Sequence, residues 1–99
     1  MKKDVNIKLA VMTFRFRASW VHSLKEKRMI IKSLIAKLQN KYHASVAETG
    51  EQDVHQILEV SVAFIVPDTV MADSMMDDIA AFAESATEAE LIFETREIR

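Results

Sequence analysis

Apolar and polar residues alternate at the start of the chain, and the spacing of the apolar residues then changes. The first alternating set is Val5, Ile7, Leu9 and Val11. Alternation of this kind predicts a strand, which continues to about residue 16. Further along, apolar residues recur at spacings of three, four and seven, as on the buried face of a helix. This second set is Leu24, Ile31, Leu34, Ile35, Leu38 and Tyr42. It predicts a helix over residues 24–41, and Ser23 followed by Glu26 forms a capping box at its start.

The second half of the chain shows two more strands, a helix and a final strand. HASVAET and QILEVSVAFIV are strand-like and are separated by the loop TGEQD, which predicts a hairpin. Pro67 ends the second of these strands, and Asp68 is a suitable cap for the next helix. The apolar stripe of that helix is Met71, Met75, Ile79, Phe82 and Ala86. The last segment, AELIFETREI, is predicted to be a strand.

The order of these elements predicts the fold. A strand–helix–strand unit has a right-handed crossover and parallel strands, and this chain contains two such units. The expected fold is therefore α+β and ferredoxin-like, βαββαβ, with two helices on one face of a four-stranded antiparallel sheet. Residues 1–99 form a single domain. In this topology the segment SLKEKR (residues 23–28) and the hairpin TGEQDVHQ (49–56) lie at the same end of the sheet.

Charge is distributed unevenly along the chain, although the net charge is only −2. Residues 1–41 hold eleven Lys and Arg against two acidic residues, whereas residues 42–99 hold two against thirteen. Such asymmetry indicates an anionic partner for one surface, or two halves that neutralise each other in the fold. Asn6 and Lys8 interrupt the N-terminal apolar stretch, which argues against a secretory signal. With no apolar run of membrane-spanning length, we expect a cytoplasmic protein without a membrane partner.

Several segments together resemble a known family. SLKEKR entering a helix, KSLIAKL continuing it, and SVAE and QD before a buried strand resemble the YlxP-like family, a bacterial domain of unknown function. The resemblance covers nearly the whole chain and implies a ferredoxin-like fold. It also implies a link to translation, because genes of the family often lie among translation genes, and it implies no enzymatic activity. The chain departs from the family at residues 18–22, at Met29 and at His55.

Cations gather where the helix over residues 24–41 begins, although that end of a helix is already positive. The candidate residues for binding an anion or RNA are Lys25, Lys27, Arg28 and Lys32. A helix N-terminus with Lys and Arg suits phosphate. The alternative is a solvated helix surface. The candidate supporting residues of the hairpin are Glu48, Gln52, Asp53 and His55. Their carboxylates could also order the cations by ion pairing, which would be a structural role.

The face of the sheet away from the helices is the second candidate surface. An apolar set is expected there and is interpreted as the interface of a homodimer. Its members are Met12, Phe14, Phe16, Ala63, Ile65 and Ile92. The alternatives are a homodimer formed through an exposed sheet edge, or ordinary apolar residues of a protein surface. The residues of strand 57–66 in the exposed phase include no aromatic pair, which argues against base stacking of the kind found in RRM domains.

Catalytic chemistry has little support in the sequence. The three histidines show no HxH or HExxH spacing of metal ligands, and no serine or cysteine is placed to act as a nucleophile. We therefore expect no cofactor and no metal, and we expect Trp20 to cover the core. The leading hypothesis is a non-enzymatic binding module that contacts RNA or a ribosomal particle through phosphates, without DNA sequence readout. The alternative is a homo-oligomeric interaction or regulatory domain that binds a protein or a small anion.

Overall fold

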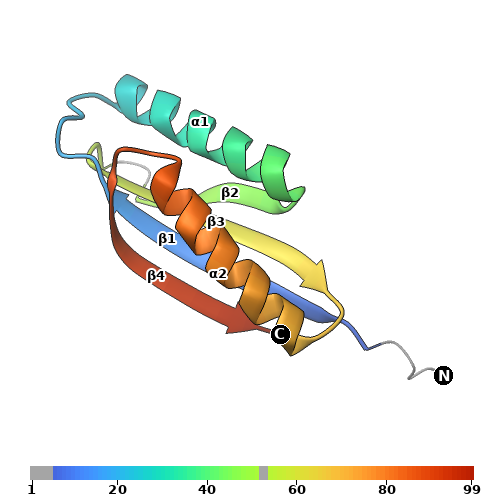
Figure 1. The fold of residues 1–99 in the computed structure, drawn as a ribbon. Coiled ribbons are helices and arrows are strands. Elements are labelled where there is room, and N and C mark those ends of the chain that lie inside the picture. The colour runs from blue at the N-terminus through green and yellow to red at the C-terminus, as the bar shows by residue number, and fades with distance from the viewer. Residues whose placement is uncertain (1–5, 52–53) are drawn as a thin grey trace.

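The computed structural model describes residues 6–51 and 54–99 and has the predicted order of elements (Figure 1). The elements are β1 (Lys8–Arg17), α1 (Leu24–Tyr42), β2 (Ser45–Gly50), β3 (Ile57–Val66), α2 (Thr69–Ser85) and β4 (Glu90–Ile98). The strand order in the sheet is β2-β3-β1-β4, and every neighbouring pair is antiparallel. Both helices cover the same face, α1 over β2 and α2 over β1 and β4. The prediction of an α+β ferredoxin-like fold is confirmed.

Local capping explains where the two helices begin. Ser23 accepts a hydrogen bond from the backbone N–H of Glu26 (3.1 Å), and the Glu26 carboxylate accepts one from the N–H of His22 (3.1 Å). The capping box thus satisfies one N–H group that a helix start leaves free, that of Glu26, and also the N–H of His22, which precedes the N-cap residue. Asp68 caps α2 by accepting from the N–H of Met71 (2.8 Å). At the other end of α1, His43 takes a left-handed conformation (φ 53°) and stops the helix.

The core lies between the sheet and the helices, and it corrects the predicted orientation of β1. Met12, Phe14 and Phe16 are fully buried there and do not lie on the open face. The register explains this result, because they pair with Val62, Val60 and Leu58 of β3, which also face the helices. β1 carries apolar residues in both phases, so its own alternation does not choose the buried face. The other phase contains Arg15 and Arg17, which the helices could not cover without leaving two guanidinium groups in the core.

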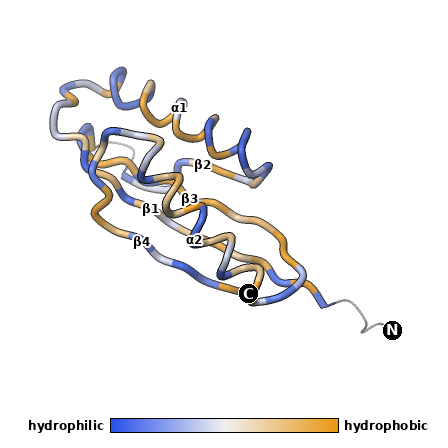
Figure 2. Tube along the Cα trace, viewed as in Figure 1, coloured by the Kyte–Doolittle hydropathy of each residue, from blue (hydrophilic) through white to orange (hydrophobic). Residues whose placement is uncertain are grey.

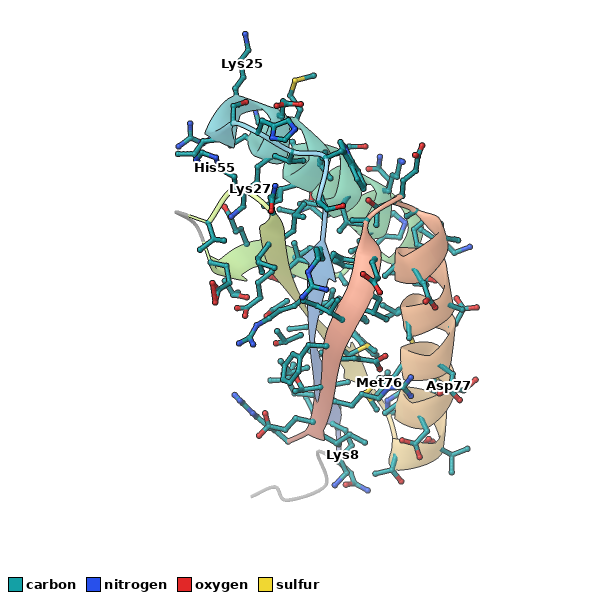
Figure 3. The ribbon with its side chains drawn as sticks, turned by 90° about the vertical axis from the view of Figure 1, so that its left-hand side faces the viewer. Lys8, Lys25, Lys27, His55, Met76 and Asp77 are labelled. Carbon is teal, nitrogen blue, oxygen red and sulfur yellow. The ribbon has the colours of Figure 1, made fainter. Side chains whose placement is uncertain are left out.

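The buried face of α2 is rotated from the predicted stripe but overlaps it, because Ile79 is buried and Met75, Phe82 and Ala86 pack against the core. Its buried residues are Ala72, Met76, Ile79 and Ala83, whereas Met71 is exposed. Figure 3 shows Met76 turned toward the sheet. Asp77 is more exposed, and its carboxylate pairs with Arg96 of β4 (2.5 Å). The small side chains of Ala72 and Ala83 let the helix approach the sheet closely. In Figure 2, β3 is hydrophobic along most of its length, while hydrophilic and hydrophobic turns alternate along α1.

Candidate functional site

The start of α1 and the hairpin between β2 and β3 meet at one end of the molecule. Lys25, Lys27 and His55 lie together at this end in Figure 3, where Lys25 points away from the molecule. The side chain of Lys27 joins the two segments, because its ammonium group donates a hydrogen bond to the carbonyl oxygen of Val54 (2.6 Å). The sequence-based prediction that SLKEKR and the hairpin are neighbours is confirmed.

Lys27 is an internal residue and does not belong to an exposed anion site. Only 1% of it is exposed, and its ammonium group donates to the carbonyl oxygens of Glu51 and Val54. The carboxylate of Glu48 lies 4.0 Å away. Lys27 is buried because its position on the helix falls beside Ile31 and Leu34, on the face that packs on the sheet. Its charge therefore orders the hairpin, and the prediction that it binds an external anion is wrong.

Of the four predicted hairpin residues, the structure describes two. Glu48 faces α1 and approaches Lys27, and His55 is exposed. Gln52 and Asp53 lie outside the described residues. Within residues 6–51 and 54–99 no group of three His, Asp or Glu side chains is arranged to hold a metal ion.

The other three predicted cations form one exposed row, which we call the cationic stripe (Lys25, Arg28 and Lys32). At 100° per residue, the three side chains leave α1 within an arc of roughly 60°. Between residues 6–51 and 54–99, none of the three makes an ion pair. Glu26, the acidic residue of the first turn, is engaged in the capping box instead. The stripe therefore presents three cations to solvent, of which Lys25 lies in the first turn at the positive end of the helix, Arg28 follows it, and Lys32 lies about one turn further along.

The charge asymmetry of the sequence is partly neutralised in the sheet and persists in the helices. Arg15 pairs with Glu59 (2.7 Å), and Arg17 pairs with Glu90 (3.7 Å), so β3 and β4 neutralise the two arginines of β1. In the helical layer Asp77 of α2 pairs with Arg96 of β4 (2.5 Å), but the two helices still differ in the sign of their charge. Beyond its single Glu26, α1 carries only basic ionic residues, whereas α2 carries only acidic ones. Those of α2 are Asp73, Asp77, Asp78 and Glu84. The helical layer thus has a basic side and an acidic side.

A hydrogen-bonded network crosses the open face of the sheet, and the sequence analysis did not identify it. Glu59 is only 8% exposed and accepts hydrogen bonds from Arg15 (2.7 Å) and from the hydroxyl of Thr49 (2.9 Å). Thr49 shares a hydrogen bond with Ser61 (2.8 Å), which shares another with Thr13 (2.8 Å). The hydrogen bond from Arg15 holds the pKa of Glu59 below its ordinary value of 4.5, although burial opposes this shift.

Phe93 and Gly50 lie next to this network. The guanidinium group of Arg15 lies over the ring of Phe93, 4.6 Å from its centre. Gly50 provides room for the carboxylate of Glu59, because a Cβ at this position would lie 2.5 Å from a carboxylate oxygen. The sequence did place Glu59 and Ser61 on the exposed face of β3, because they alternate with its buried residues. Their partners Arg15 and Thr13 were not identified, because the wrong face of β1 was predicted to be buried.

Three predicted interface residues remain, Ala63, Ile65 and Ile92, and none of them is fully buried. Ile65 is the most exposed of them (67%), on the open face, and Ala63 is half-buried beside it. Ile92 sits where the β1–β4 register shifts and is also exposed. Trp20 does not cover the core as expected. It lies half exposed at the rim of a groove of about 570 Å³ between α1 and the end of α2.

Comparison with known proteins places this geometry in a family. A family model described as a protein of unknown function, DUF503, matches residues 9–96. The chain belongs to the DUF503 family. A relative, the uncharacterized protein YlxP of Bacillus subtilis (strain 168), is 34% identical over 68 residues, covering 69% of this chain and 74% of that protein. The resemblance to the YlxP-like family is therefore confirmed.

Solved structures resemble this DUF503 protein in fold alone. The Bacillus subtilis YXEP protein, described as a dinuclear metal binding peptidase from the M20 family, matches with a TM-score of 0.58 at 11% identity. That match covers 99% of this chain but 27% of the peptidase. The de novo designed protein Foldit4 matches with a TM-score of 0.52 at 12% identity, over 95% of this chain and 94% of that one. Among the described residues, no helix has the length and hydropathy to cross a membrane.

Proposed function

We propose that this DUF503 protein is a non-catalytic, cytoplasmic binding module that holds RNA through the cationic stripe on α1. The observation that carries the proposal is that neighbouring cations of α1 differ in burial. Lys27 is buried and satisfied by carbonyl oxygens, while Lys25, Arg28 and Lys32 are exposed, and none of the three forms an ion pair within the described part of the chain. A row of exposed cations at a helix N-terminus suits a chain of phosphate groups.

The dimensions of the stripe support contact with more than one phosphate. Lys25 and Lys32 are seven residues apart, which corresponds to about 10 Å along the helix axis. Neighbouring phosphates of a nucleic acid strand lie within this span. Contacts of this kind give affinity and orientation but do not select bases, so no sequence readout is part of the proposal. A ribosomal particle is the expected source of the RNA, because the family resemblance implies a link to translation.

The test is the double variant Lys25→Ala with Arg28→Ala, titrated against ribosomal RNA at several salt concentrations. Binding should weaken, and the slope of log affinity against log salt should become shallower by about one to two phosphates. The matched control is Lys37→Ala with Lys41→Ala, which removes two charges from the same helix outside the stripe. Unchanged affinity and slope in the stripe variant, or equal losses in both variants, would contradict the proposal.

The alternative is a module that binds a small anion or a protein. The same exposed cations favour it, since a single phosphate or carboxylate needs only one or two of them. The titration separates a module for RNA from a module for a small anion. A small anion contacts fewer cations than a strand of RNA does, so the affinity of the protein for it falls less steeply as the salt concentration rises. Inorganic phosphate that competes fully with RNA at low millimolar concentration would favour the small anion.

A further inference from the structure

The open face of the sheet is the side that neither helix covers, and it combines exposed apolar residues with a closed polar network. Its apolar members include Ile65 (67% exposed), Phe93 (42%) and Leu9 (37%). Leu9 and Ile65 are direct cross-strand partners, so they form one patch at the end of the face. Between this patch and Phe93 lies the network from Thr13 to Arg15. Exposed apolar patches of this kind mark interaction surfaces.

The hydroxyl groups and the carboxylate in the middle of the face can be covered without losing the hydrogen bonds that they make to one another. Thr13, Ser61, Thr49 and Glu59 bond to one another, and Arg15 completes the chain. Burial of a polar group is costly when its partners are water molecules that must leave. Here the partners belong to the same chain, and Glu59 is already largely removed from water. A contact over this network would therefore leave the three hydroxyl groups and Glu59 satisfied. The remaining N–H groups of Arg15, whose side chain is 40% exposed, would need acceptors or water molecules in the contact.

The charges of the open face are also matched within the chain. Its ion pairs are Arg15 with Glu59, Arg17 with Glu90, and Arg99 with Glu97. In a two-fold symmetric contact the same surface meets itself, so a surface of one sign repels its copy. α1 is basic and α2 is acidic, and neither suits such a contact. The open face balances its charges and meets this condition.

From these observations we propose that a second copy of this chain packs face to face against the open side of the sheet. β1 extends about 33 Å, and four strands span about 19 Å, which gives each copy a flat footprint of roughly 600 Å². Two copies would bury about 1,200 Å², the lower end of the range for stable interfaces. The dimer would have two central sheets with the helices outside. The predicted residues Met12, Phe14 and Phe16 have no part in this contact.

The decisive variant is Ile65→Glu, studied by sedimentation velocity from micromolar to submillimolar concentration. The wild-type protein should be dimeric. The variant should have a dissociation constant higher by about tenfold or more, because it places a charge in an apolar contact at two symmetric positions. The matched control is Val70→Glu, which charges another exposed apolar residue (78%) on α2, away from the sheet. The control should remain dimeric. Circular dichroism should show both variants folded, since both side chains are exposed.

A second measurement locates the contact directly. In a mixture of isotope-labelled and unlabelled protein, filtered NOEs should connect the methyl groups of Leu9 and Ile65 to the partner copy. Wild-type protein that is monomeric at submillimolar concentration would overturn the proposal. So would a dimer that survives Ile65→Glu, or intermolecular NOEs confined to the helices or to the edge of β4. The RNA proposal is independent of these outcomes, because neither variant alters the cationic stripe.

Discussion

Lys27 and Arg28 are adjacent in the sequence, yet their charges have different surroundings. The ammonium group of Lys27 lies under the hairpin and contacts backbone carbonyl oxygens, whereas the guanidinium group of Arg28 faces solvent. A lysine is rarely buried unless it is paired, and here the carbonyl groups of Glu51 and Val54 and the nearby carboxylate of Glu48 take that role. Within SLKEKR, Lys27 therefore has a structural role, which accounts for one of the three cations in this segment.

Replacing Lys27 with Met should destabilise the fold by about 1–3 kcal/mol. Met keeps most of the aliphatic stem but leaves the carbonyl oxygens of the hairpin without their donor. Urea unfolding followed by circular dichroism measures the effect. The control is Lys25→Met, which makes the same chemical change at an exposed position of the same turn and should alter the free energy of unfolding little. Equal effects of the two variants would show that the hairpin does not depend on the buried ammonium group.

Glu59 should make the stability of the protein depend on pH in the acid range. Its pKa is lowered in the folded state, chiefly by the hydrogen bond from Arg15, so its charged form favours folding. This contribution is present above the ordinary pKa of 4.5 and is lost as the pH falls through the lower folded value. The stability difference between wild type and Glu59→Gln, measured by urea unfolding, should therefore shrink below about pH 4.5. A difference that stays constant from pH 7 to pH 3 would argue against this account.

At the scale of elements, the start of α1 depends on one short-range motif. Ser23→Ala should lower the free energy of unfolding by about 0.5–2 kcal/mol, because the N–H of Glu26 loses its acceptor. Ser33→Ala, an exposed change within the same helix, serves as the control and should be neutral or slightly stabilising. Thermal or urea unfolding measures both. An unchanged midpoint for Ser23→Ala would mean that another group caps the helix.

The same short range explains which elements could be predicted from the sequence. The capping box, Pro67 and Asp68 act within four residues, and the period of apolar residues is a local property, so the helices and strands were found. The orientation of β1 could not be found this way, because Leu9 and Val11 compete with Met12, Phe14 and Phe16. The buried face of β1 is decided by its register with β3 and by the cost of placing Arg15 and Arg17 in the core. The burial of Lys27 likewise depends on carbonyl groups more than twenty residues away.

At the scale of the whole molecule, the separation of basic α1 from acidic α2 has a kinetic consequence. Opposite charges on two sides of one body make an electric dipole, and a dipole near a highly charged polymer experiences a torque before any contact forms. The protein would rotate to bring α1 forward while it is still a Debye length away, about 8 Å at physiological salt. Orientation during approach raises the fraction of encounters that succeed, so α2 would raise the association rate of the proposed RNA ligand although it repels it.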